Sequence, residues 1–244
     1  AVEHCGATKR QAEAAYRQAE TAILSFRHQL VEEGKRVIAD TGKAGGFAVV
    51  LAGRSYHTDP LINHDLSGMF TRRGIPVLTV DSLPGLEKAD LRRSRVEITN
   101  DFHARMLSGA MVTAEQPCLE YVQIVSFGCG HDAILSDEII RLLGEGSGKP
   151  PLILKVDESE AAGSLGIRVQ SFIETVQLRR SAQAEQAACR LPEPYAVKYR
   201  KEDRKLRTVL VPNISAPVST LLTALMDREG IRAVRLPVGG VEQI

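Results

Sequence analysis

The chain has 244 residues, of which 43% are hydrophobic and 25% are charged, an ordinary composition for a globular protein. Its formal net charge of +1 creates no field that would attract nucleic acid or an anionic membrane. Aromatic residues make up only 5% and tryptophan is absent, so the chain also lacks a surface on which bases could stack. We therefore expect no nucleic-acid partner and no membrane partner.

The cysteines and the first residues indicate a cytoplasmic protein. Cys5, Cys118, Cys129 and Cys189 are widely spaced, which does not suggest a disulfide framework. The chain starts without a signal-peptide pattern, and no apolar run approaches the roughly 20 residues that span a bilayer. It also starts without Met, so we expect a processed chain or an excised piece.

The first predicted element is a long amphipathic helix from about Thr8 to Ala39, rich in Ala, Glu, Gln and Arg. Glycines within residues 41–46 break it, so residues 1–45 are predicted to form an N-terminal helical segment. A helix of this length could mediate contacts, although the sequence does not decide the oligomeric state.

The middle of the chain alternates short apolar runs with segments of helical composition. Continuous apolar runs are typical of strands buried on both faces of a parallel sheet. The predicted strands are 47–53, 75–79, 121–126 and 151–155, and the predicted helices are 61–73, 98–111, 132–143 and 162–185. This alternation predicts a Rossmann-like α/β domain of βαβ units over residues 46–190.

The character of the chain changes after Ala188. Prolines and a charged run predict a linker over residues 191–207, and acidic residues within the run favour a solvated surface over a binding patch. Residues 208–244 then read as strand, helix and strand, which predicts the first part of a second, truncated α/β domain.

Polar side chains follow the predicted strands, at the edge where open parallel sheets bind ligands. The predicted polar cleft comprises Arg54, Tyr56, His57, Asp81, Ser126, Asp132 and Lys155. Arginine and lysine at such an edge hold phosphate or carboxylate groups. The alternative is that Arg54 and Lys155 form ion pairs with neighbouring carboxylates such as Asp81, Asp157 or Glu158.

Cys129 lies between Gly128 and Gly130, where a predicted strand turns into a helix. A helix N-terminus favours a thiolate, which acts as a nucleophile or as a metal ligand. The alternative is a small, buried and inert cysteine. A Cys-dependent hydrolase is the weakest interpretation, because the glycine spacing departs from G-x-S-x-G and His131 follows too closely to be the base. His57 or His64, from the segment after the first strand, could approach as the base instead.

Standard nucleotide and metal motifs are missing. Residues 144–149 imitate a P-loop, but the spacing is short and the segment precedes a strand instead of following one. No G-x-G-x-x-G follows the first strand, so neither an ATP site nor an NAD site is predicted. The histidines and aspartates within residues 57–65 lack a recognised metal-ligand spacing.

Several segments resemble the long CoA-substrate-specific enzyme activase proteins, in their region related to 2-hydroxyacyl-CoA dehydratases. The segments are 51–64 (LAGRSYHTDPLINH), 74–82 (GIPVLTVDS), 119–132 (LEYVQIVSFGCGHD), and 155–158 (KVDE) with 166–173 (GIRVQSFI). The resemblance covers most of residues 46–175 in the same order, and residues from Thr208 onward resemble the start of the next dehydratase-like domain. The chain departs from the family pattern at Ser55, where the family usually has proline, and at His131.

The resemblance implies a role in anaerobic metabolism. Activators of this family use ATP hydrolysis to drive a low-potential electron onto the iron–sulfur cluster of a 2-hydroxyacyl-CoA dehydratase or a benzoyl-CoA reductase. By the same resemblance, Cys129, flanked by Gly128 and Gly130, is the expected cluster ligand and metal-binding residue. One cluster requires three or four thiolates, and Cys118 is too distant, so the remaining ligands are expected from the rest of the full-length protein.

The resemblance also implies partners, namely other domains or subunits of an activase and dehydratase system, and it leaves acyl-CoA open as a ligand. The chain has no actin-like ATPase signature, so it is not expected to be the ATPase itself. A non-catalytic scaffold or docking domain is the main alternative.

Overall fold

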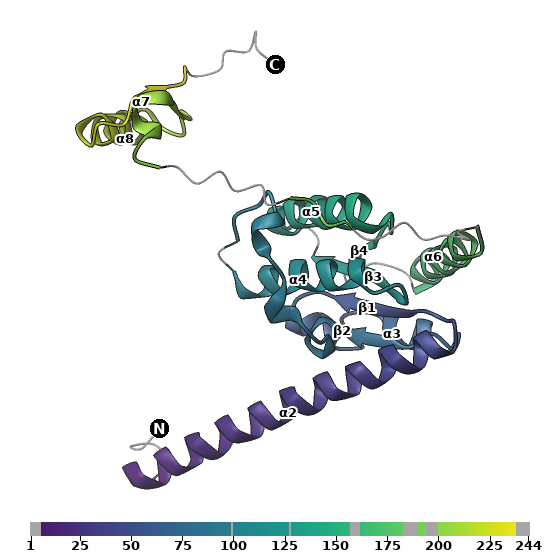
Figure 1. Ribbon diagram of the computed structural model, residues 1–244. Helices are drawn as coiled ribbons and strands as arrows, with labels where there is room; N and C mark the ends of the chain where they lie inside the picture. Colours follow the sequence, from purple (N-terminus) through teal and green to yellow (C-terminus); the bar gives the residue numbers. More distant parts are fainter. Residues whose placement is uncertain are drawn as a thin grey trace. The chain divides into compact units, whose positions relative to one another are not determined.

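The computed structural model in Figure 1 describes residues 6–98, 100–126, 128–156, 162–182, 190–193 and 200–237. The chain divides into two compact units, Ala1–Ala196 and Val197–Ile244. The division falls inside the segment 191–207 that the sequence predicts as a linker.

Unit 1 is built on a four-stranded parallel sheet with the strand order β2-β1-β3-β4. The strands are β1 (Ala48–Ala52), β2 (Val77–Thr79), β3 (Leu119–Ser126) and β4 (Leu152–Val156). All of β1 and nearly all of β3 are buried, as the continuous apolar runs predict for central parallel strands. The predicted α/β class with a Rossmann-like parallel sheet is therefore confirmed.

Helices cover both faces of this sheet. The helices are α2 (Lys9–Lys43), α3 (Leu66–Thr71), α4 (Asp101–Glu115), α5 (Gly130–Ser147) and α6 (Ala162–Ala182). On one face, side chains of α4, α5 and the end of α2 pack against alternate strand residues such as Val50 and Tyr121. On the other face, α3 and α6 pack against Val49 and Val122. Alternate residues of each strand therefore belong to two separate hydrophobic cores, one on each face of the sheet.

Helix α2 is one continuous helix whose first half lies beyond the sheet (Figure 1). It starts at a capping box formed by Thr8 and Gln11, and it ends near Gly45, which has a φ of +68°. The sequence predicted an end near Ala39, but the helix continues for one more turn because Gly42 is accommodated within it.

The orientation of α2 follows from two contacts. The Thr41 carbonyl accepts from Gly46 N just before β1 starts, whereas Gly34 lies against the backbone of Ser82, beyond the end of β2. Helix α2 therefore runs opposite to the strands, and residues 9–30 extend past the carboxyl edge of the sheet. Every residue from Glu13 to Gln29 is exposed.

The segment after β1 differs from the predicted helix 61–73. A 3-10 turn (Ser55–Thr58) comes first, and α3 begins only at Leu66. His64 and Asp65 have φ angles of 53° and 55°, a left-handed conformation that excludes them from a right-handed helix. The buried Asn63 side chain fixes this turn by donating to His57 O and accepting from Leu66 N.

Unit 2 contains the strand–helix–strand order that the sequence predicts. Its elements are α7 (Asp203–Leu206), β5 (Val209–Val211), α8 (Ala216–Arg228) and β6 (Ala233–Arg235). Strands β5 and β6 pair in parallel, and the Ser215 hydroxyl caps α8.

Candidate functional site

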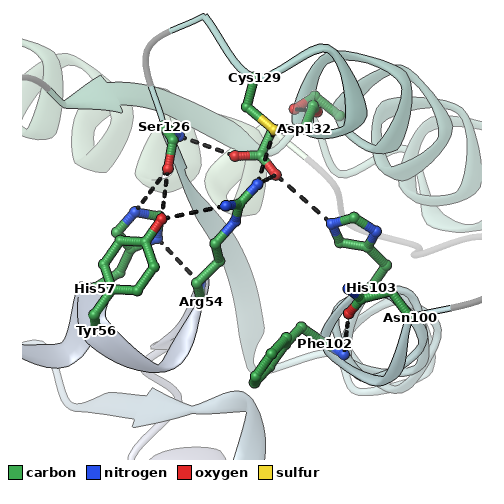
Figure 2. A network of polar contacts seen from close by, with 10 residues as sticks. Arg54, Tyr56, His57, Asn100, Phe102, His103, Ser126, Cys129 and Asp132 are labelled. Atoms are coloured by element: carbon green, nitrogen blue, oxygen red, sulfur yellow. Dashed lines mark hydrogen bonds and ion pairs between the residues drawn. The ribbon is translucent and has the colours of Figure 1, made fainter.

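The candidate site lies where β1 and β3 end. These strands are neighbours, and the chain order reverses between them, which is where open α/β sheets form their binding crevice. The segment after β1 supplies Arg54, Tyr56 and His57, and the segment from the end of β3 into α5 supplies Ser126, Cys129 and Asp132 (Figure 2). Residues distant in the sequence thus meet at the middle of the carboxyl edge.

Cys129 occupies the N-cap position of α5. Gly128, with a φ of +73°, makes the turn that leads into it, and an added Cβ on Gly130 would meet no atom within 4 Å. The half-buried sulfur accepts a hydrogen bond of 2.8 Å from Arg54 Nη2. An arginine and a helix N-terminus are the surroundings in which proteins place reactive or metal-bound thiolates.

Asp132 holds Arg54 in this position. Its Oδ1 atom accepts from Arg54 Nη2 at 3.0 Å, and its Oδ2 atom accepts from Ser126 N at 3.0 Å. The carboxylate is 2% exposed. Its hydrogen bond and charge raise the pKa of Arg54 well above its usual value, so the guanidinium remains a cation.

A second chain of hydrogen bonds joins His57, Ser126 and Tyr56 (Figure 2). His57 Nδ1 accepts from Arg54 N at 3.1 Å, His57 Nε2 lies 3.3 Å from Ser126 Oγ, and Ser126 Oγ lies 2.9 Å from Tyr56 OH. Burial lowers the pKa of His57, which favours the neutral ring. Since Nδ1 accepts, the proton of neutral His57 is on Nε2, which donates to Ser126.

The hydroxyl protons of Ser126 and Tyr56 determine which hydrogen bond this network can donate to a ligand. Ser126 and Tyr56 carry one hydroxyl proton each, but a single hydrogen bond joins their two oxygens. Tyr56 also accepts from Arg54 Nη1 at 3.4 Å. Whichever hydroxyl donates to the other, one proton of the pair has no acceptor in the network of Figure 2 and is available to an acceptor group beside Cys129.

A pocket of about 120 Å³ opens beside the network, between the ends of β1 and β2 and the start of α4. Arg54 and His57 line one side, and Asp81, Phe102 and Arg105 line the other. Asp81 forms an ion pair with Arg105. Burial lowers the pKa of Arg105, and the nearby charge of Arg27 on α2 adds to this effect.

The first turn of α4 contributes residues that the sequence interpretation missed. Asn100 caps the helix by accepting from Phe102 N, and His103 Nε2 lies 3.7 Å from Asp132 Oδ1. Arg105 reaches the pocket. The available signal was the position of the helix start: a helix that packs antiparallel to the strands begins at their carboxyl edge, so its first turn faces the site.

The predicted cleft residues divide into three groups. Arg54, Tyr56, His57, Ser126 and Asp132 come together around Cys129. Asp81 lies across the pocket and pairs with Arg105. Arg54 forms an ion pair, as the alternative interpretation of the sequence has it, but with Asp132 and not with Asp81. Lys155 is on β4 with an exposed side chain and is not part of the network of Figure 2. Asp157 and Glu158 lie outside the described residues.

The other chemical groups singled out in the sequence have structural roles. Cys118 is buried before β3 begins and donates to Ile38 O, at the opposite edge from Cys129. Lys149, the lysine of the P-loop imitation, donates to the carbonyls of Thr113, Gln116 and Leu119. Asp65 pairs with Arg72. Among the residues that the structure describes, no group of three or more His, Cys, Asp or Glu could hold a metal ion.

Comparison with known proteins bears on the first third of the chain. Residues 1–83 match the family model of the CoA enzyme activase uncharacterised domain (DUF2229), and this match confirms the resemblance to CoA enzyme activases. The matched segment contains α2, β1, β2 and the residues Arg54, Tyr56 and His57. No curated protein and no solved structure matches the chain.

None of the helices in the described parts of the chain has the length and apolar composition needed to cross a membrane.

Proposed function

We propose that this chain is a dehydratase-like domain of a CoA enzyme activase system, in which Cys129 supplies one thiolate to an iron–sulfur cluster used in anaerobic electron transfer. The observation that carries the proposal is the Cys129 sulfur at the head of α5, which accepts from the Arg54 guanidinium at the β1/β3 crevice. The activase match over residues 1–83 supports the system to which the domain would belong.

The described residues fit one ligand position and not a complete ligand set. A cluster needs three or four thiolates, and the other cysteine in the part of the chain that the structure describes, Cys118, lies at the opposite edge of the sheet. The proposal therefore requires the remaining ligands from another segment or from a partner subunit. Acyl-CoA as the substrate of that partner is part of the same proposal.

The chain's own residues have defined tasks under this proposal. Arg54 donates to the sulfur, and hydrogen bonds to ligand sulfurs tune the potential of iron–sulfur centres. Asp132 fixes the guanidinium and keeps it charged. The Ser126–Tyr56 pair presents a hydroxyl proton to an acceptor next to the sulfur.

The test is anaerobic reconstitution with iron and sulfide of the complete protein, together with its dehydratase-type partner subunits. Iron per chain and visible absorption are measured for the wild type, for Cys129→Ala and for Cys118→Ala. Cys118 is the matched control, because its sulfur is buried at the opposite edge of the sheet. We expect Cys129→Ala to lose iron and Cys118→Ala to retain the wild-type amount, with both variants folded by circular dichroism.

Equal iron in Cys129→Ala and the wild type would overturn the ligand assignment. The domain would then be a scaffold or docking domain, which is the second candidate function, favoured by the incomplete ligand set. A Cys-dependent hydrolase has less support. Both ring nitrogens of His57 are engaged by Arg54 N and Ser126, so this histidine does not act on the sulfur.

A further inference from the structure

The exposed half of α2 carries an apolar stripe that nothing in unit 1 covers. The stripe consists of Ala12, Tyr16, Ala19, Ile23, Phe26 and Leu30, whose spacing alternates between four and three residues. Tyr16 is 70% exposed, Ile23 is 52% exposed and Phe26 is 64% exposed. This spacing is the heptad pattern with which helices pair in coiled coils.

The stripe is continuous with a contact that already exists. After a second interval of four residues, from Leu30 to Gly34, the stripe continues through Gly34, Val37 and Thr41, and this part of α2 packs against unit 1. One face of the helix is therefore apolar throughout its length, but only its last turns are covered. Most of the stability of a helix in a protein comes from the packing of its apolar face, so the uncovered stripe is a surface that fits another helix.

The charges beside the stripe indicate which helix that is. One flank carries Glu13, Glu20 and Arg27 at intervals of one heptad, and the other flank carries the uncharged Ala15, Ala22 and Gln29. In an antiparallel pair of identical helices centred near Glu20, each Glu13 faces the Arg27 of the other copy. A parallel pair would place the charged flank of each helix against the uncharged flank of the other, with no complementary charges.

We propose that residues 9–30 of α2 form an antiparallel two-helix coiled coil with the same segment of a second copy of this chain. Ile23 faces Ala19 of the second copy, and Tyr16 faces its Phe26, so that large residues meet small or flat ones. Two Glu13–Arg27 pairs set the register, and the two Glu20 side chains face each other near the centre, where they weaken the pair. The small residues Ala15 and Ala22 allow the helices to approach closely.

The apolar part of the proposal is tested by the mass of the 244-residue chain in light scattering after size exclusion. The wild type is expected at twice 26.6 kDa. Ile23→Asp is expected to raise the dimer dissociation constant by about a hundredfold or more, because it places a charge in the seam. Leu24→Asp is the matched control: Leu24 is 59% exposed but lies off the stripe, so this variant is expected to remain dimeric.

The orientation is tested by exchanging charges. Glu13→Arg and Arg27→Glu are each expected to weaken the dimer by roughly threefold to tenfold, since each places like charges in contact. The double variant, and an equimolar mixture of the two single variants, are expected to restore the wild-type constant. Arg10→Glu, on the far side of the helix, is the control for net charge and is expected to have no effect.

Three results would overturn the proposal. The first is a wild-type chain that stays monomeric at concentrations of tens of micromolar. The second is a dimer that Ile23→Asp leaves intact while circular dichroism shows a folded chain. The third is a dimer that both single charge variants leave unchanged or that the double variant fails to restore, which would exclude the antiparallel register.

Discussion

Asp132 connects more elements of unit 1 than any other residue of the candidate site. It lies in the first turn of α5, accepts from Arg54 after β1 and from the backbone of Ser126 at the end of β3, and faces His103 on α4. Because it is buried, its charge is stabilised by these donors rather than by water. The position of the Arg54 guanidinium on the Cys129 sulfur thus depends on a residue that does not touch the sulfur.

We therefore predict that Asp132→Asn destabilises the protein by about 1–3 kcal/mol, because it leaves the partly buried Arg54 cation without its counter-charge. Denaturant unfolding measures this change. Asp137→Asn, an exposed aspartate on the same helix, is the control and is expected to change the free energy of unfolding by less than about 0.5 kcal/mol. Equal effects of the two substitutions would mean that the Arg54–Asp132 pair contributes no net stability.

At the scale of elements, the seating of α2 depends on a glycine. A Cβ on Gly34 would overlap the backbone carbonyl of Ser82, so only glycine permits this approach of helix and loop. We predict that Gly34→Ala destabilises unit 1 by about 1–3 kcal/mol through overpacking. Thermal and denaturant unfolding would measure the loss.

Gly42 supplies a control, because its substitution by alanine is expected to change the stability in the opposite direction. It is also within α2, but an added Cβ would meet no atom within 4 Å. Gly42→Ala is therefore expected to stabilise the protein by about 0.5 kcal/mol, because alanine is the better helix former. If Gly34→Ala were equally stabilising, α2 could not be seated against Ser82 as described.

The sequence predicted those elements whose pattern follows from burial. The strands β1 and β3 are continuous apolar runs because helices cover both faces, and α5 begins and ends within four residues of its predicted bounds. Residues 61–65 were predicted as the start of a helix, but α3 begins only at Leu66. The conformation of these residues depends on the side chain of Asn63 and on two non-glycine residues with positive φ, features that composition does not reveal.

The sequence predicted part of the candidate site's membership and none of its pairing. The βαβ rule placed Arg54 and Cys129 at one edge. It could not show that Arg54 pairs with Asp132 instead of Asp81, because that choice depends on the distance between loops and on the turn at Gly128. His103 and Arg105 were missed because their helix contains no local pattern that marks a site.

At the scale of the whole molecule, the two units differ in how completely they are built. Unit 1 has one apolar cluster on each face of its sheet. Unit 2 has strands of three residues each, and α8 leaves Val218, Leu221 and Leu225 exposed. Two-stranded sheets are marginal without further packing, and the described part of unit 2 buries far less apolar surface than unit 1.

Global stability should also depend on pH through His57. Its folded-state pKa lies below the ordinary value of 6.5 because the ring is buried. The unfolded chain therefore binds a proton at a higher pH than the folded chain. The contribution of the neutral ring to stability is present above about pH 6.5 and is lost as the pH falls below that value.

We predict that the free energy of unfolding decreases from pH 7.5 to pH 5, and that His57→Asn makes this decrease smaller. His28→Asn is the control, because His28 is exposed on α2. Denaturant unfolding at a series of pH values measures both slopes. Identical slopes for His57→Asn and the wild type would show that His57 does not titrate differently in the folded state.

Helix α2 is attached to unit 1 only through its last turns, so a change of its tilt there moves its first turn over a longer distance. The helix has 35 residues, which corresponds to about 50 Å, and the contact between Gly34 and Ser82 is the point about which it would tilt. A tilt of about 5° at that contact would displace Lys9 by roughly 3 Å, given 1.5 Å of rise per residue. Val80 and Asp81, in the same short turn as Ser82, line the pocket beside Arg54. A small rearrangement of the pocket wall would therefore be amplified into a movement at the far tip of the helix.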